Sequence, residues 1–187
     1  MRATRAVADV RNLPRTVFGN RALLFGFEPF RVPSSAMQPT LVPGDFIVVD
    51  SRNGSESDIR RGDIVTFAPS HHPGETWIKR VVGLPGERVV VDGNKVSVDG
   101  TLLDEPWPTV DQPVLPLPGE FMQATLGPDE FYLMGDNRPN SEDSRFTGPV
   151  KQHQLRGKVR AIWFHYSPFT HSIETSRIGI LADAPTD

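Results

Sequence analysis

Four short segments hold the residues whose types and spacing can do chemistry. They are PSSAMQPTL at residues 33–41, GDIV at 62–65, IKRVVGLPG at 78–86 and GDNRPNSEDSR at 135–145. A serine hydroxyl is a weak nucleophile at its own pKa, and a nearby amine or imidazole base activates it by taking its proton. The segments contain serines, one lysine and several acids, so together they hold the groups needed to attack an amide.

In this order and at these separations, the four segments resemble bacterial type I signal peptidase, which cleaves signal peptides from exported proteins. The resemblance spans roughly residues 25–164. It implies a Ser/Lys endopeptidase without a cofactor, whose partners are the signal peptides of exported preproteins and which cuts after a small residue. It also implies a place at the bacterial plasma membrane, with the catalytic domain on the extracytoplasmic side and the membrane surface as a further partner.

The resemblance assigns roles to single positions. Residue 36 has the position of the nucleophile and Lys79 that of the general base. Ser34 matches the residue whose hydroxyl, with the backbone N–H of residue 36, stabilises the oxyanion. Ser141 matches the serine that orients the lysine amine.

The remaining polar residues of the last segment are expected to support the site. Asp143 and Arg145 match an ion pair in the resembled family. We expect Asp136, Asn137 and Arg138 to shape the loop and to satisfy buried backbone groups, without a part in proton transfer.

Residue 36 is an alanine, Ala36. A methyl group cannot be deprotonated or acylated, and loss of a serine nucleophile costs about 10⁶ in turnover in subtilisin, so we expect this chain to be inactive. If residues 30–36 are extended, Ser35 points away from the face of Ala36 and cannot replace it.

An engineered serine-to-alanine change explains the intact remaining residues more simply than drift in a natural pseudoenzyme. The alternatives are a natural pseudopeptidase that binds signal-peptide-like segments without cutting them, and a self-cleaving repressor with a related Ser/Lys core. The leader shows no helix-turn-helix pattern that would favour the repressor.

A lysine that acts as a base must lose its proton near neutral pH, which burial among apolar side chains favours. Alternation along an extended strand places Trp77 and Val81 on the same side as Lys79. Cleavage after small residues implies shallow apolar pockets, and an extended substrate would pair with neighbouring strands. The residues expected to line these pockets are Phe30, Val32, Met37, Leu41, Ile47, Trp77 and Ile78.

Composition narrows the remaining classes. The chain has 187 residues, 37% of them hydrophobic and 23% charged, and a net charge of -3. These values indicate one elaborated globular domain and give no reason to expect nucleic acid as a partner. The chain has no cysteine, which excludes a disulfide scaffold and a thiol nucleophile. The five histidines show no metal-binding spacing and no matching acidic partner, so we expect no metal.

Prolines and glycines divide the chain into short β-branched runs, which favours a mainly β, antiparallel and barrel-like catalytic core. The strands are expected at 46–49, 63–67, 87–91, 95–98 and 158–164, with a hairpin turn at 92–94 and a proline-rich surface loop at 104–119. The expected divisions are a basic leader at 1–21, the core at 22–87 and 131–170, a small β-rich insertion at 88–130 and a tail at 171–187.

The leader contains five arginines, and its longest apolar run is too short to cross a bilayer. We therefore expect no transmembrane helix and a soluble chain, whose anchor was removed or never present. A short helix is possible around Val7, Val10 and Leu13.

Overall fold

The structure, a computed structural model, describes residues 26–52, 59–110, 122–167 and 170–181. Within these ranges strands dominate, and each helix is about one turn long. The strands are β1 (Phe27–Arg31), β2 (Asp45–Asp50), β3 (Ile64–Phe67), β4 (Trp77–Gly83), β5 (Arg88–Asp92), β6 (Lys95–Val98), β7 (Thr101–Leu102), β8 (Gln123–Thr125), β9 (Glu130–Met134), β10 (Val150–Lys151), β11 (Leu155–Ser167), β12 (Ser172–Ile173) and β13 (Gly179–Ile180). The helices are η2 (Arg138–Asn140), α3 (Ser144–Thr147), η3 (Gln152–Gln154) and η4 (Thr175–Arg177).

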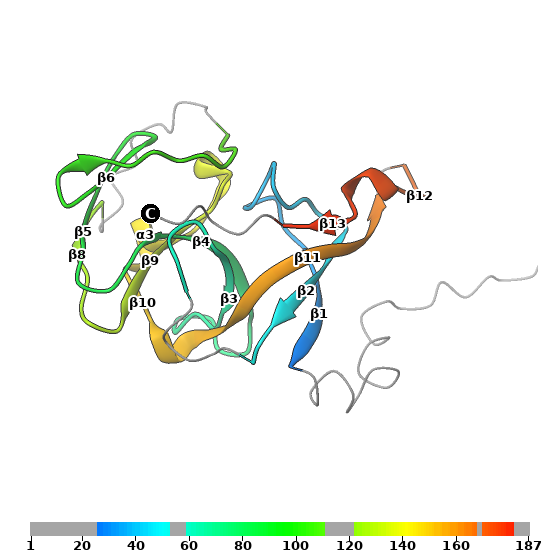
Figure 1. The fold of residues 1–187 in the computed structure, drawn as a ribbon, viewed down its shortest axis with the longest axis horizontal. Helices are drawn as coiled ribbons and strands as arrows, with labels where there is room; N and C mark the ends of the chain where they lie inside the picture. Colours follow the sequence, from blue (N-terminus) through cyan, green and yellow to red (C-terminus); the bar gives the residue numbers. More distant parts are fainter. Residues whose placement is uncertain (1–25, 53–58, 111–121, 168–169, 182–187) are drawn as a thin grey trace, which may run out of the picture.

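The larger sheet is antiparallel, in the order β1-β2-β11-β3-β4-β9-β10. Its long strand β11 pairs with β2 along one part and β3 along another, and the pairing register shifts three times. Such bulges bend a strand and increase its twist. Figure 1 shows β11 running diagonally across the molecule, so that the sheet curls into a half-barrel. The predicted mainly β, antiparallel core is confirmed.

Four strands form a second sheet, in the order β7-β6-β5-β8. It lies at the opposite end of the molecule from β1 (Figure 1). Its apolar face packs on β4 and β9 through a cluster that includes Val82, Val89 and Tyr132. All four strands fall within 88–130, the range of the predicted insertion, whose status as a separate domain stays a prediction.

Five predicted strands are confirmed as β2, β3, β5, β6 and β11, with ends that differ by at most three residues. The hairpin is confirmed as well, because Asp92 pairs with Lys95 across a two-residue loop. The first loop residue, Gly93, has a φ of 58°, a conformation that glycine adopts without strain.

The described part of the C-terminal segment is attached to the larger sheet. Both β12 and β13 pair with β11. Arg177 in η4 forms an ion pair with the buried Asp45 at 2.7 Å, and His165 Nδ1 lies 2.7 Å from the same carboxylate. Residues 171–181 are thus fastened to the core by charge as well as by strand pairing.

Some sequence predictions lie outside the described residues. These are the leader at 1–21 with its possible short helix, and residues 111–119 of the proline-rich stretch. The described part of that stretch, 104–110, contains no strand. Among the described residues, none of the helices has the length and apolarity that a membrane crossing requires.

Candidate active site

The first of the four segments forms a turn after β1. The strand ends at Arg31, and two backbone hydrogen bonds then close tight turns: Gln38 N donates to Ser35 O at 3.0 Å and Leu41 N to Met37 O at 2.9 Å. The condition for placing Ser35 and Ala36 on opposite faces, an extended backbone through residue 36, is therefore not met, because a bend begins at Ser34 and a turn at Ala36. The segment contains two prolines, which lack the N–H that a continuing strand would need.

A groove of about 510 Å³ opens beside this turn. Ser34 and Ala36 line it from the turn, and Lys79 lines it from β4. Its full lining is Val32, Pro33, Ser34, Ala36, Met37, Glu75, Thr76, Trp77, Ile78, Lys79, Asn140 and Glu142. The fold thus brings the predicted nucleophile position, oxyanion-hole residue and base to one groove.

Lys79 is only 5% exposed. It pairs with the fully buried Val65 across β3 and β4, and its Nζ lies 5.3 Å from the ring centroid of Trp77. Burial lowers the pKa of Lys79, although the charges of Asp143 and Glu142 act in the opposite direction. An amine in this environment gives up its proton more readily than an exposed lysine.

The last segment holds the turn in place through hydrogen bonds from Asn137 to the backbone carbonyls of the turn. Asn137 N donates to Ala36 O and its side-chain amide donates to Ser35 O, both at 3.0 Å. Gly135 lies between Ala36 and Ser141: a Cβ added there would be 2.5 Å from Ala36 O and 2.2 Å from Ser141 Oγ. No side chain fits in this gap. The sequence analysis gave Gly135 no role, although it begins the polar segment.

Ser141 does not make the hydrogen bond expected of it. Its Oγ is buried and has no hydrogen-bond partner within the described residues, so it does not bond to the amine of Lys79. The hydroxyl lies next to Gly135, where a Cβ would come within 2.2 Å of it. A buried hydroxyl without a partner costs about 1–3 kcal/mol, so this group gains from any partner that comes within reach.

Asp143 and Arg145 form a buried, two-point ion pair. Arg145 Nε lies 2.8 Å from Asp143 Oδ1 and its Nη2 lies 2.9 Å from Oδ2. Asp143 also accepts a hydrogen bond from Gly135 N at 3.0 Å and caps the start of α3. Arg145 donates to the carbonyl of Arg138 at 2.6 Å. The pair therefore anchors the loop that carries Ser141.

One hydrogen-bond network joins all four sequence segments. Arg80 Nε and Nη2 donate to the Asp136 carboxylate at 2.8 and 2.6 Å, and Arg80 Nη1 donates to Gly62 O at 2.7 Å. The Thr40 hydroxyl also donates to Asp136. These residues come from the third, fourth, second and first segments in turn. This agrees with the structural role expected for Asp136.

Four of the seven predicted pocket residues line the groove, namely Val32, Met37, Trp77 and Ile78. The other three lie elsewhere: Leu41 and Ile47 are fully buried in an adjoining apolar cluster, and Phe30 packs against it. A side chain without exposed surface cannot contact a substrate in the groove. The sequence analysis did not foresee the polar lining residues Glu75, Thr76, Asn140 and Glu142.

Known proteins resemble this chain over most of its described length. The family described as "Signal peptidase, peptidase S26" matches residues 15–164. "Signal peptidase I" of Bacillus caldolyticus is 36% identical over 155 residues, which cover 78% of this chain and 82% of that protein. "Probable signal peptidase I-2" of Synechocystis is 32% identical over 157 residues, which cover 81% of this chain and 66% of that protein.

Among solved structures, a signal peptidase I from Enterococcus faecalis is 30% identical to this chain. The match covers 56% of this chain and 98% of the solved chain, with a TM-score of 0.45.

Proposed function

The chain belongs to the signal peptidase family, peptidase S26, and from that premise we propose that it is a signal peptidase I-type endopeptidase with an inactive nucleophile position. Its substrates are the signal peptides of exported preproteins, cut after a small residue. Its place of action is the membrane surface on the extracytoplasmic side. The chain with Ala36 binds such peptides without cutting them.

One observation carries the proposal. Lys79 is a buried lysine with a lowered pKa, and it lines the same groove as Ala36 and Ser34. Burying the charged ammonium costs free energy, so burial favours the neutral amine, which can deprotonate a serine hydroxyl. A base, an oxyanion donor and a position for a nucleophile in one groove are a set of groups that can attack a peptide bond without a metal.

Each group has a defined part in the proposed reaction, and Lys79 acts first as base and then as acid. A serine at position 36 loses its proton to the Lys79 amine and attacks the carbonyl carbon of the scissile bond. The oxyanion that forms is stabilised by the Ser34 hydroxyl and the backbone N–H of residue 36. The ammonium of Lys79 then protonates the leaving amine, and water hydrolyses the acyl-enzyme. Ser141 is assigned the orientation of the amine by family resemblance, which requires its hydroxyl to turn toward Lys79 when a peptide binds.

The groove supports selection of small residues. Val32, Met37 and Ile78 provide apolar lining next to Ala36. A peptide in extended conformation would present alternate side chains to this lining, so that its first and third residues before the cleavage site enter it. Large side chains at those positions would clash with the buried Met37 and Val32.

The test is to restore the hydroxyl. The Ala36→Ser variant is incubated with a peptide spanning a signal-peptide cleavage site, with detergent present, and the products are mapped by mass spectrometry. We expect cleavage after a small residue, at a rate about 10⁶ above that of the parent chain. Adding Lys79→Ala abolishes it, whereas the matched change Lys95→Ala, at an exposed position of β6, does not. The proposal is wrong if the folded Ala36→Ser variant cuts nothing or if the parent chain cuts equally well.

The alternative is a natural pseudopeptidase that captures signal-peptide-like segments. It predicts peptide binding by the parent chain and no gain of cleavage in the Ala36→Ser variant. A serine codon at position 36 of the encoding gene would exclude it without any assay.

A further inference from the structure

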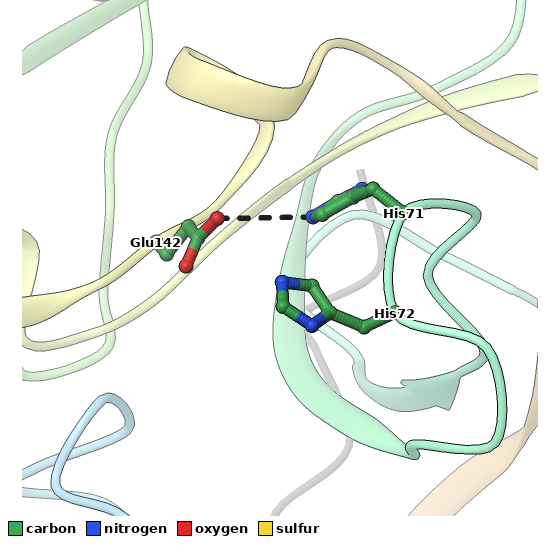
Figure 2. A group of neighbouring side chains, drawn as sticks. All are labelled: His71, His72 and Glu142. Atoms are coloured by element: carbon green, nitrogen blue, oxygen red, sulfur yellow. Dashed lines mark ion pairs between the residues drawn. The ribbon is translucent and has the colours of Figure 1, made fainter.

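Two histidines and a carboxylate meet at the rim of the groove, outside the residues given a catalytic role above. His71 and His72 lie in the loop between β3 and β4, and Glu142 follows Ser141. One ligand atom from each of the three lies within 4.8 Å of the other two. His71 Nε2 is 3.7 Å from Glu142 Oε1. Figure 2 shows that both imidazole rings direct a nitrogen toward this carboxylate. The structure thus supplies the acidic partner that the sequence analysis did not find.

The two rings pack against Trp77 on one side and are exposed on the other. The ring centroids of His71 and His72 each lie 5.3 Å from that of Trp77, and 4.8 Å from each other. Glu75 adds a second constraint, because its Oε1 lies 3.6 Å from His72 Nδ1 while its Oε2 accepts a hydrogen bond from Trp77 Nε1 at 2.7 Å. A carboxylate beside one imidazole nitrogen sets the ring's orientation and tautomer and leaves the other nitrogen to bind a metal.

We propose that His71, His72 and Glu142 bind a divalent transition-metal ion of the zinc class. Two imidazoles and one carboxylate are a ligand set that Zn²⁺ takes, with a fourth position left for water. Bond lengths of about 2.0–2.2 Å require ligand atoms roughly 3.3 Å apart, so the side chains must close in by an ångström or so. They are free to do this, since their side chains are 40%, 43% and 57% exposed. Ca²⁺ and Mg²⁺ prefer oxygen ligands and are disfavoured by two nitrogens.

The bound ion would join two segments far apart in the sequence. His71 and His72 belong to the loop that leads into the Lys79 strand, and Glu142 belongs to the loop that carries Ser141 and is fastened by Asp143. Glu142 also lines the groove. Metal binding would therefore fix the spacing of two walls of the groove and stabilise the folded chain over the unfolded chain.

The experiment is a zinc titration of the full chain, free of any affinity tag and of chelator, in competition with a chromophoric zinc indicator. We expect one equivalent to bind, with no competition from Mg²⁺ or Ca²⁺. His71→Ala, His72→Ala and Glu142→Gln each weaken binding by more than about tenfold, and Glu75→Gln weakens it by about tenfold through the orientation of His72. The matched control is His153→Ala, at an exposed position of η3, which leaves binding unchanged.

Thermal unfolding gives a second readout. At a zinc concentration 100 times the Kd, the Tm of the parent chain rises by about 5–10 °C, and that of the Glu142→Gln variant does not. The metal-free variants must unfold at the parent's Tm, which shows that they fold. The proposal is overturned if zinc does not saturate a single site, or if the three ligand variants bind zinc as the parent does. Neither measurement uses peptide cleavage, so failure here leaves the proposed peptidase function standing.

Discussion

Gly135 is the position at which a single added methyl group tests the architecture of the site. A Cβ there would lie 2.2 Å from Ser141 Oγ, 2.5 Å from Ser141 Cβ and 2.5 Å from Ala36 O. Rotation of the Ser141 side chain relieves the first contact, but not the other two, because a Cβ and a backbone carbonyl do not move when χ1 changes. Gly135→Ala must therefore push apart the two segments that meet at Ala36, the proposed nucleophile position.

Overpacking of this kind costs about 1–3 kcal/mol, and the lower chain entropy of alanine in the unfolded state returns only about 0.4–1 kcal/mol. We expect Gly135→Ala to lower the free energy of unfolding by about 1–2 kcal/mol, measured by urea denaturation with tryptophan fluorescence. In the Ala36→Ser background, displacement of the reacting groups by about 1 Å lowers kcat by roughly 10².

Gly179→Ala is the matched control for this prediction. Nothing lies within 4 Å of a Cβ built at Gly179, so the same chemical change should alter stability by no more than about 0.5 kcal/mol. If Gly135→Ala and Gly179→Ala share one denaturation midpoint, the close approach of Ser141, Gly135 and Ala36 is not present in solution and the reasoning fails.

Three other changes test charge and hydrogen bonding around the groove. Ser141→Ala removes a buried hydroxyl that has no partner among the described residues, so urea denaturation should show unchanged stability or a gain of up to about 1 kcal/mol; a loss of more than that would reveal a partner. Lys79→Met should be more stable than the parent at pH 7 and lose this advantage toward pH 10. Burial lowers the pKa of Lys79 in the folded chain, so at a pH between the folded and unfolded pKa values the unfolded chain binds more protons than the folded chain. The parent's free energy of unfolding therefore rises with pH in this range. If the urea midpoints of Lys79→Met and the parent differ by the same amount at pH 7 and at pH 10, the prediction is wrong. Arg177→Ala should cost about 2 kcal/mol at pH 7, because two hydrogen bonds to the Asp45 carboxylate are lost. Burial alone would raise the pKa of Asp45, but its hydrogen bonds outweigh burial and the pKa is lowered. The stability lost in Arg177→Ala should therefore shrink as the pH falls below about 4 and the carboxylate is protonated. Urea denaturation at pH 7 and pH 3 measures this difference.

Local patterns were enough to predict the fold class and five of the thirteen strands in the described ranges. Short β-branched runs between turns depend on side-chain sterics and on backbone conformation, both of which are properties of neighbouring residues. The hairpin around Gly93 is such a case, because a glycine in a two-residue loop between strands meets a local requirement.

Local alternation did not reveal the turn that carries Ala36. It placed Ser35 and Ala36 on opposite faces only for an extended backbone, but hydrogen bonds from Gln38 to Ser35 and from Leu41 to Met37 close turns there. Asn137, about one hundred residues later, then holds this turn by its backbone and side-chain amides. A contact over that separation leaves no trace in the local pattern.

The sequence by itself determined the chemical inventory: a lysine in a predicted strand, several serines, an alanine at the proposed nucleophile position, and no cysteine. Only the tertiary structure decided how these groups meet. It buried Lys79, left the Ser141 hydroxyl without a partner among the described residues, placed Glu142 beside His71 and His72, and put Leu41 and Ile47 in the core rather than the groove. The physical reason is that burial and proximity depend on which distant segments pack together, and this packing is a property of the whole sheet rather than of any one strand.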